Sequence, residues 1–194
     1  MYLVGFNGPP HCGKDSVANK VIEICQHLGT PSIRASLAWP MRVVGMSLLG
    51  QNVFDGERYA ELKESALPLF YGDTLRQFMI NFSESFIKPK YGQDFFARCL
   101  INAVLQQRVA SKNTVIFVPD VGFQIEPSYF ESVLGEANVL IVQLAREGCN
   151  FAKDSRSYVG GSHNLGIENN GTLEDAAQRV YNKMIALGWP VVPF

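Results

Sequence analysis

Near its N-terminus the chain reads Gly8-Pro9-Pro10-His11-Cys12-Gly13-Lys14-Asp15-Ser16, directly after the apolar residues 2–6 and directly before a helical pattern. Gly8 and Gly13 frame this segment, and glycines let backbone N–H groups approach a phosphate with no side chain in the way. Lys14 adds a positive charge for the outer phosphates of a nucleotide, and the helix that starts there directs its dipole at the same anion. The order of strand, loop and helix predicts a phosphate-binding loop.

One position departs from the usual phosphate-loop pattern. A magnesium-binding Ser or Thr normally follows the lysine, whereas this chain has Asp15 there and brings its hydroxyl one residue later, at Ser16. An aspartate is a hard oxygen ligand that holds Mg²⁺ directly or through water, and Ser16 still offers a hydroxyl to a phosphate. The alternative is a chance glycine-rich turn, which the preceding strand and the following helix disfavour.

Composition excludes several classes of protein. The 194 residues suit one domain, and a formal net charge of −1 does not favour a general binder of nucleic acids or membrane surfaces. No apolar stretch approaches the roughly 20 residues that cross a bilayer, and no basic segment precedes an apolar one at the N-terminus. A cytoplasmic protein with a small anionic ligand is therefore expected.

Cysteine spacing indicates neither zinc nor disulfides, because the four cysteines are scattered and form no C-x-x-C pair. Cys12 lies at the expected N-terminus of a helix, where the pKa of a thiol is lowered and its reactivity raised. The alternative is that Cys12 is simply a small residue of the loop.

Hydrophobic patterns predict an α/β protein. Continuous apolar runs at 115–118 and 139–144, together with residues 2–6 and 33–36, are typical of strands of a buried parallel sheet. Helical periodicity covers residues 14–28, 37–49, 74–87, 94–109 and 172–187. Thr172 and Asp175 have the spacing of a capping box at the start of the last of these helices.

The stretch 155–171 shows no periodicity and is rich in Gly and Asn. A long irregular segment in a compact domain is usually functional or mobile, so a lid over a nucleotide is one interpretation. A solvated connection is the other. We expect one domain over residues 1–194, with an acceptor-binding helical region at about 37–110 and a lid-like loop at about 146–171.

Further motifs follow in a recognisable order. They are Ser36-Leu37-Ala38-Trp39-Pro40-Met41-Arg42, Lys63-Glu64, Thr74-Leu75-Arg76-Gln77-Phe78-Met79, Val118-Pro119-Asp120-Val121-Gly122 and Asn169-Asn170-Gly171-Thr172-Leu173-Glu174-Asp175. With the glycine-lysine-aspartate-hydroxyl loop, their order and spacing resemble the bacteriophage deoxynucleoside monophosphate kinases over nearly the whole chain.

The resemblance implies a P-loop kinase with a three-layer α/β/α fold and a parallel sheet of about five strands. The implied reaction transfers the γ-phosphoryl group of ATP, with Mg²⁺, to a deoxynucleoside monophosphate. Such an acceptor carries its own anionic oxygen nucleophile, so the enzyme needs positioning and charge neutralisation more than a general base.

The loop and the resemblance together assign roles to residues. Catalytic roles fall to Lys14, Arg76 and Asp120, and the metal would be held by Asp15, Ser16 and Asp120. The residues expected to bind ATP are Gly8, His11, Cys12, Gly13, Lys14, Asp15, Ser16, Arg146 and Arg156. The residues expected to bind the acceptor are Arg42, Lys63, Arg76, Gln77, Glu84 and Lys88, with Ser83 in the same region.

Two departures limit the resemblance. Relatives have an arginine where this chain has Gly122, so either another arginine substitutes or the acceptor differs. Relatives also place Ser-Glu soon after a lid histidine, which His163 does not match, so we assign His163 no role.

Alternative functions remain open. A P-loop kinase for another phosphorylated acceptor, such as dephospho-coenzyme A or phosphomevalonate, would have the same donor half, and Gly122 also suits a nucleotide-binding protein without phosphotransfer. The resemblance implies a possible homodimer, no direct nucleic-acid or membrane partner, and the cytoplasm of a phage-infected bacterium as the setting.

Overall fold

The computed structural model describes residues 1–106, 111–152 and 154–192. Within it the chain divides into two compact units, which we describe separately. Unit 1 comprises Met1–Leu37 and Leu100–Phe194, and unit 2 comprises Ala38–Cys99. None of the helices described is long and apolar enough to cross a membrane.

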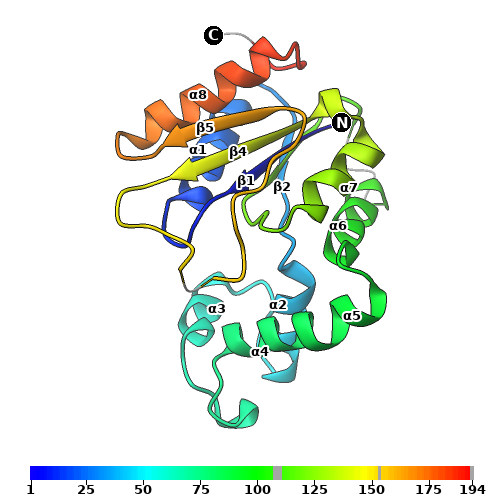
Figure 1. The fold of residues 1–194 in the computed structure, drawn as a ribbon, viewed down its shortest axis with the longest axis vertical. Helices are drawn as coiled ribbons and strands as arrows, with labels where there is room; N and C mark the ends of the chain where they lie inside the picture. The colour runs from blue at the N-terminus through cyan, green and yellow to red at the C-terminus, as the bar shows by residue number, and fades with distance from the viewer. Residues whose placement is uncertain (107–110, 153, 193–194) are drawn as a thin grey trace. The chain divides into compact units, whose positions relative to one another are not determined.

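Unit 1 is built on a five-stranded parallel sheet (Figure 1). Its strands are β1 (Tyr2–Asn7), β2 (Ser32–Arg34), β3 (Val115–Val118), β4 (Val139–Ala145) and β5 (Asn164–Glu168), in the spatial order β2-β3-β1-β4-β5. Every pairing is parallel, with Val4 opposite Phe117 in β3 and Leu140 in β4. The predicted α/β class and the five-stranded parallel sheet are confirmed.

Helices of unit 1 bury the two faces of this sheet. On one face, α1 (Lys14–His27) and α8 (Leu173–Ala186) pack together over the alternate strand residues Val4, Phe117 and Val142. On the other face, α7 (Ile125–Leu134) contacts β1 and β4 and buries Phe130 completely. Alternation along each strand therefore supplies two apolar surfaces, which is why β1, β3 and β4 are nearly continuous apolar runs.

The helix ends of unit 1 agree with the sequence signals. The Thr172 hydroxyl accepts a hydrogen bond from the Asp175 N–H (3.1 Å), which satisfies one of the free donors at the start of α8. Gly29 follows α1 with φ 74°, in the left-handed conformation that glycine adopts without steric cost. Both predicted helices thus end within two residues of their expected bounds.

Unit 2 is helical. It contains α2 (Trp39–Leu48), α3 (Gly56–Lys63), the 3₁₀ turn η1 (Pro68–Phe70), α4 (Leu75–Phe82), the π-helical turn η2 (Ser83–Ile87) and α5 (Lys88–Tyr91), and α6 (Phe95–Gln106) leads the chain back into unit 1. A row of aromatic rings runs along it, with Phe70, Phe78, Phe82 and Phe86 stacked in succession. Phe78, Phe82 and Phe86 lie four residues apart on α4 and η2, so they share one face of this helical segment, and Phe70 of η1 stacks on Phe78.

The structure corrects several expected elements. Strand β5 lies inside the stretch 155–171, for which the sequence predicted no regular structure. The sequence gives no sign of this strand because only Ile167 of its five residues is buried, so the usual alternation of apolar and polar residues is weak. Helices α3 and α7 were not predicted, and the expected helix 74–87 changes to π geometry at Ser83. The end of the expected helix 94–109 lies outside the described residues.

Candidate functional site

The phosphate loop has the backbone that its glycines predict. Gly8 has φ 153° and Gly13 has φ 97°, and a Cβ atom at Gly8 would lie 2.8 Å from the Cys12 Sγ atom and closer still to the Leu144 carbonyl oxygen. No side chain of the described residues caps α1 at Gly13. The first N–H groups of α1 are therefore left for an anion, where the helix dipole also favours negative charge.

Lys14 is folded back into this loop. Its ammonium group donates to the carbonyl oxygens of Gly8 (2.7 Å) and Pro9 (2.6 Å), and only 9% of the residue is exposed. Burial lowers the pKa of Lys14 below its ordinary value, with the positive charge of Arg156 lowering it further and Cys12 opposing. A cation that is poorly solvated and bonded only to neutral acceptors is well placed to bind an incoming phosphate.

Cys12 does not have the environment expected for a reactive thiol. Its side chain is fully buried, and desolvation raises the pKa of the thiol, outweighing the opposing effect of Lys14. Of the two interpretations, the favoured one, a small residue of the loop, agrees with this burial, and the lowered pKa does not occur. Its carbonyl oxygen accepts a hydrogen bond from Asn169 Nδ2 (2.8 Å), while the neighbouring His11 is exposed with φ 64°.

The two predicted metal ligands on α1 are both exposed. The Asp15 carboxylate forms an ion pair with Arg34 at the end of β2, a residue that the sequence did not single out. Ser16 is on the surface of the first turn. No cluster of three or more His, Cys, Asp or Glu side chains suited to a metal occurs within the described part of the chain.

Asp120 follows β3, at the edge of the sheet where open α/β proteins place ligand-binding residues. Its carboxylate accepts hydrogen bonds from the Ser36 hydroxyl (2.7 Å) and the Leu37 N–H (3.0 Å). It also lies near enough to Arg156 for its charge to raise the pKa of that residue. Asp120 thus joins the ends of β2 and β3 while remaining in the field of a cation.

Arg156 is the second cation of the unit 1 site. Its guanidinium group forms a two-point ion pair with Asp154, through Nε–Oδ1 (2.8 Å) and a terminal nitrogen–Oδ2 contact (2.5 Å). Arg146 behaves differently, because it follows β4 on an exposed turn. Of the two predicted arginines, Arg156 shares its electrostatic surroundings with Lys14.

Asn7 is a residue of the site that sequence reasoning missed. This amide is fully buried at the end of β1, where Nδ2 donates to the carbonyl oxygens of Val121 (3.0 Å) and Ser157 (3.1 Å), and Oδ1 accepts from the Val159 N–H (3.1 Å). It therefore ties the segment before the phosphate loop to two distant loops. The only sequence signal is a polar residue closing an apolar strand.

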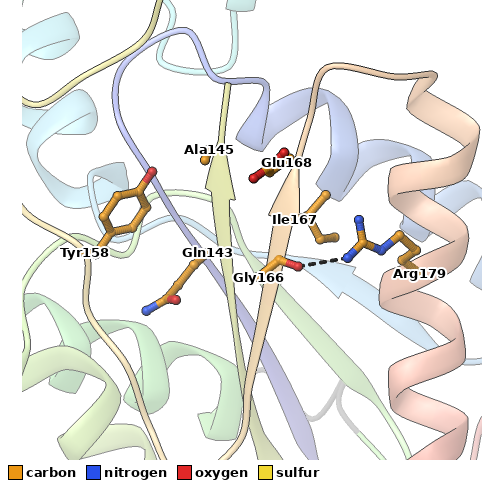
Figure 2. A pocket seen from close by; sticks show the side chains of 7 residues that line it. All are labelled: Gln143, Ala145, Tyr158, Gly166, Ile167, Glu168 and Arg179. Carbon is orange, nitrogen blue, oxygen red and sulfur yellow. Dashed lines mark hydrogen bonds between the residues drawn. The ribbon is translucent and has the colours of Figure 1, made fainter. Parts of the chain in front are cut away.

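An open groove lies farther along the sheet. Figure 2 shows it over β4 and β5, with Arg179 reaching from α8 to the Gly166 carbonyl oxygen (3.0 Å). Its volume is about 540 Å³. The groove is lined by Gln143, Ala145, Tyr158, Gly166, Ile167, Glu168 and Arg179. None of the predicted site residues is among them.

Unit 2 brings together two of the predicted acceptor-binding cations. Arg42 lies over the rings of Tyr59 (4.3 Å to the centroid) and Trp39 (5.3 Å), and Lys63 lies over the same Tyr59 ring (5.7 Å). The Nε atom of Arg42 is buried and has no hydrogen-bond partner among the described residues. A buried hydrogen-bond donor without a partner costs free energy, so the Nε–H group of Arg42 is suited to bind an anionic ligand.

The other predicted acceptor residues are paired within unit 2. Arg76 donates from Nε (2.7 Å) and a terminal nitrogen (2.5 Å) to Oε1 of Glu64. The side-chain Oε1 atom of Gln77 accepts a hydrogen bond from the Thr74 N–H (2.8 Å) and completes a capping box at α4 that was not predicted.

Lys88 and Glu84 bind each other across one helical turn (2.6 Å). The Lys88 side chain is nearly fully buried, and Ser83 beside Glu84 is also buried. Among the predicted acceptor residues, Arg76 and Lys88 are therefore already paired with carboxylates.

Comparison with known proteins identifies no family for this chain. A scan against protein-family models finds no match, and no curated protein sequence matches. Among solved structures, the chain is similar to a gluconokinase from Sinorhizobium meliloti 1021, with 12% sequence identity and a TM-score of 0.44, over 96% of this chain and 93% of the other. A function must therefore be inferred from the chain's own residues.

Proposed function

We propose that this protein is an ATP-dependent kinase that transfers the γ-phosphoryl group to a deoxynucleoside monophosphate. The observation that carries the proposal is the loop between β1 and α1, in which an uncapped helix start and the buried ammonium group of Lys14 flank the same turn. Backbone donors, a helix dipole and a desolvated cation together form a site for a polyphosphate.

The donor half of the site is supplied by the phosphate loop and its neighbours. The N–H groups of Gly8 and of residues 11–16 would surround the ATP phosphates, with Lys14 at the outer ones. The Cys12 N–H would have to leave its present bond to the Pro9 carbonyl oxygen (3.4 Å). Arg156 and Arg146 are proposed to add positive charge from the segment after β4. Because Cys12 is buried, its contribution comes from the backbone.

The acceptor half is proposed to lie in unit 2. Arg42, with an unpartnered Nε, and Lys63 share one aromatic ring, and Arg76 has a planar fork that suits a monophosphate. The side-chain Nε2 atom of Gln77 is proposed to bind the edge of the base, since only the side-chain Oε1 atom takes part in the helix cap. Glu84 and Lys88 remain proposed as acceptor contacts, and either must exchange its present partner for substrate.

Magnesium fits this site as a companion of ATP. The described residues offer isolated oxygen donors and no preformed cluster, and Mg²⁺ is often held by one or two protein oxygens together with substrate phosphates. Ser16, Asp15 and Asp120 are the residues proposed to hold it. When bound, the ion would neutralise phosphate charge, and Asp15 would have to leave Arg34 to contact it.

The proposed mechanism needs no general base, because the acceptor monophosphate is itself an anionic nucleophile. The protein's part is to hold donor and acceptor in line and to neutralise charge with Lys14, Arg76 and Arg156. Asp120 is proposed to orient the acceptor or a magnesium-bound water. With this role, the protein would act in the cytoplasm of an infected bacterium, on diphosphate supply for DNA synthesis.

The test is a direct assay of products. Pure protein, Mg²⁺ and ATP would be incubated with each deoxy- and ribonucleoside monophosphate, and with dephospho-coenzyme A and phosphomevalonate, while ADP and the phosphorylated acceptor are both measured. The K14A variant is the control for contaminating kinases.

We expect deoxynucleoside diphosphate that depends on Lys14. Transfer only to one of the other acceptors would replace the proposed substrate and keep the kinase. ATP binding without transfer to any acceptor would contradict the kinase and leave a nucleotide-binding protein, which is the alternative that Gly122 suggests.

A further inference from the structure

Arg156 occupies space that a side chain at position 122 would need. A Cβ atom added to Gly122 would lie 2.8 Å from Cγ of Arg156 and even closer to its Cδ. The stem of Arg156 therefore lies directly on the backbone of Gly122. The backbone at Gly122 is not in the left-handed region, so the room it leaves, and no special conformation, is what distinguishes it from alanine.

The segment that carries Arg156 is anchored on its C-terminal side. Asn7 holds the Ser157 carbonyl oxygen and the Val159 N–H, and the Gln143 side chain donates to the Val159 carbonyl oxygen (2.8 Å). Because Asn7 directly precedes the phosphate loop, these bonds fix Arg156 relative to Gly8 and Lys14. The position of its backbone does not depend on the partner that its guanidinium group selects.

The guanidinium group shares its surroundings with charges of both signs. The hydrogen bonds that the guanidinium group donates to Asp154 are the main cause of its raised pKa, and the charges of Asp120 and Glu126 contribute more distantly. Its positive charge in turn lowers the pKa of Lys14, after burial. Two cations therefore repel each other across the site, and an anion between them would relieve that repulsion.

We propose that Arg156 binds the phosphates of the nucleotide by exchanging Asp154 for phosphate oxygens, and that Gly122 is the positioning residue that leaves room for its side chain. The inference rests on the proposed function, which it deepens by naming how the second cation is stored. The planar fork of arginine binds carboxylate and phosphate oxygens with the same two-point geometry, so Asp154 stands in for a phosphate while none is present.

Exchange is favoured by charge. Asp154 offers one negative charge, whereas a polyphosphate offers several and also attracts Lys14. Asp154 lies two residues from Arg156 and binds its N–H as well (3.0 Å), so the carboxylate stays bonded to the backbone when the guanidinium group leaves. Asp154 thus holds the arginine ready without blocking the site permanently.

The test uses inorganic tripolyphosphate with Mg²⁺ as the probe, because its binding does not require an acceptor or a transfer step. Affinity would be measured by titration calorimetry for the natural protein, K14A, R156A, G122A, the G122A/R156A double variant and D154N. R179A is the matched control, since that arginine bonds the Gly166 carbonyl oxygen in the same unit.

We expect R156A to weaken binding about 10- to 100-fold, the range of a charge-assisted hydrogen bond. G122A should weaken binding by a similar factor, because its methyl group displaces Arg156. The double variant should bind no more weakly than R156A alone, since the methyl group has nothing left to displace. D154N should bind more tightly, because a neutral amide competes less for the guanidinium group, and R179A should bind normally.

Each other outcome separates the inference from the proposed function. Normal binding by R156A with loss of binding by K14A overturns the role of Arg156 and leaves the phosphate loop intact. Additive losses in G122A and R156A overturn the role of Gly122. Absence of tripolyphosphate binding by the natural protein overturns both the phosphate site and the exchange. The double variant lacks the steric conflict, so it also shows whether a failure of G122A is one of folding.

Discussion

The cations of unit 1 and those of unit 2 are held in different ways. In unit 1, Lys14 and Arg156 are bound by groups a few residues away in the chain, namely the Gly8 and Pro9 carbonyl oxygens and the Asp154 carboxylate. In unit 2, Arg76 is bound by Glu64 of a neighbouring helical segment, through side chains that are 39% and 60% exposed. Lys14 is buried and Arg156 is half-buried, and both are bound locally, whereas the pair of Arg76 is longer-range and solvated.

This difference in burial decides how readily each cation can bind an anion. A buried ammonium group bonded to neutral carbonyls retains most of its attraction for an anion, because desolvation has already occurred on folding. An exposed ion pair is screened by solvent and contributes little free energy, so its partner is easily exchanged. Under the proposed function, Lys14 would bind a polyphosphate with little rearrangement, whereas Arg76 would have to leave Glu64 to bind an acceptor.

Removal of Lys14 should give the largest effect. K14A deletes the buried cation, and we expect a loss of about 100-fold or more in kcat/KM for ATP-dependent transfer, as for other preorganised charges. The measurement is steady-state kinetics. K20A, on the same helix and paired with exposed Glu23 and Glu174, is the control and should behave normally. Equal losses in both variants would contradict the special role of the buried ammonium group.

Replacement of Asn7 should give the next largest effect, this time on stability. N7L leaves the Val121 and Ser157 carbonyl oxygens and the Val159 N–H without their partner, and each buried group costs about 1–3 kcal/mol when unsatisfied. We expect a fall of about 3 kcal/mol or more in the free energy of unfolding, measured with urea.

The control for N7L is N138A. Asn138 makes a single part-buried bond to the Leu134 carbonyl oxygen (2.7 Å), so about 1 kcal/mol is expected. A loss in N7L no greater than in N138A would show that the anchored segment is not part of the cooperative core of unit 1.

Replacement of Arg76 tests unit 2 against unit 1. R76A should raise the KM of the acceptor about 10-fold through loss of a charge-assisted contact, while the KM of ATP stays unchanged. R58A is the matched control, since Arg58 makes an exposed ion pair with Glu61 in the same unit. An equal rise in the KM of ATP would contradict the proposal that unit 1 binds the donor and unit 2 the acceptor.

The smallest expected effect is a pH dependence from Asp154. Hydrogen bonds from Arg156 lower the pKa of this carboxyl below its ordinary value of 3.8, so the pair stabilises the fold above that pH. The contribution is lost as the pH falls through the lowered pKa in the folded protein. Thermal unfolding of the natural protein and D154N should therefore differ more at pH 6 than near pH 3, and a constant difference would contradict the ion pair.

Local signals predicted much of unit 1. Gly8 and Gly13 have the positive φ values that a phosphate loop requires, because φ preferences depend on each residue and its neighbours alone. Thr172 caps α8 for the same reason. For Cys12 the sequence left two interpretations, and burial, which is a tertiary property, decides against a lowered thiol pKa because it outweighs the effect of Lys14.

Helices and strands with few buried residues were harder to predict from the sequence. Strand β5 has one buried residue, and α3 also has only Leu62 buried, so neither shows a clear apolar period. The predicted roles of Arg76, Gln77, Glu84 and Lys88 remain predictions. The structure adds the ion pairs that Arg76, Glu84 and Lys88 would exchange for a substrate.

The sequence by itself determined the phosphate loop, the parallel α/β sheet and the caps of its helices, since each depends on residues within one turn or one strand. The tertiary structure alone decided the burial of Lys14, the bonds of Asn7 to a segment 150 residues away, and the place of Arg156 on Gly122. The contacts of Asn7 with Ser157 and of Gly122 with Arg156 join residues far apart in the sequence. Their spacing along the chain carries no signal, because the pairing of the strands brings them together.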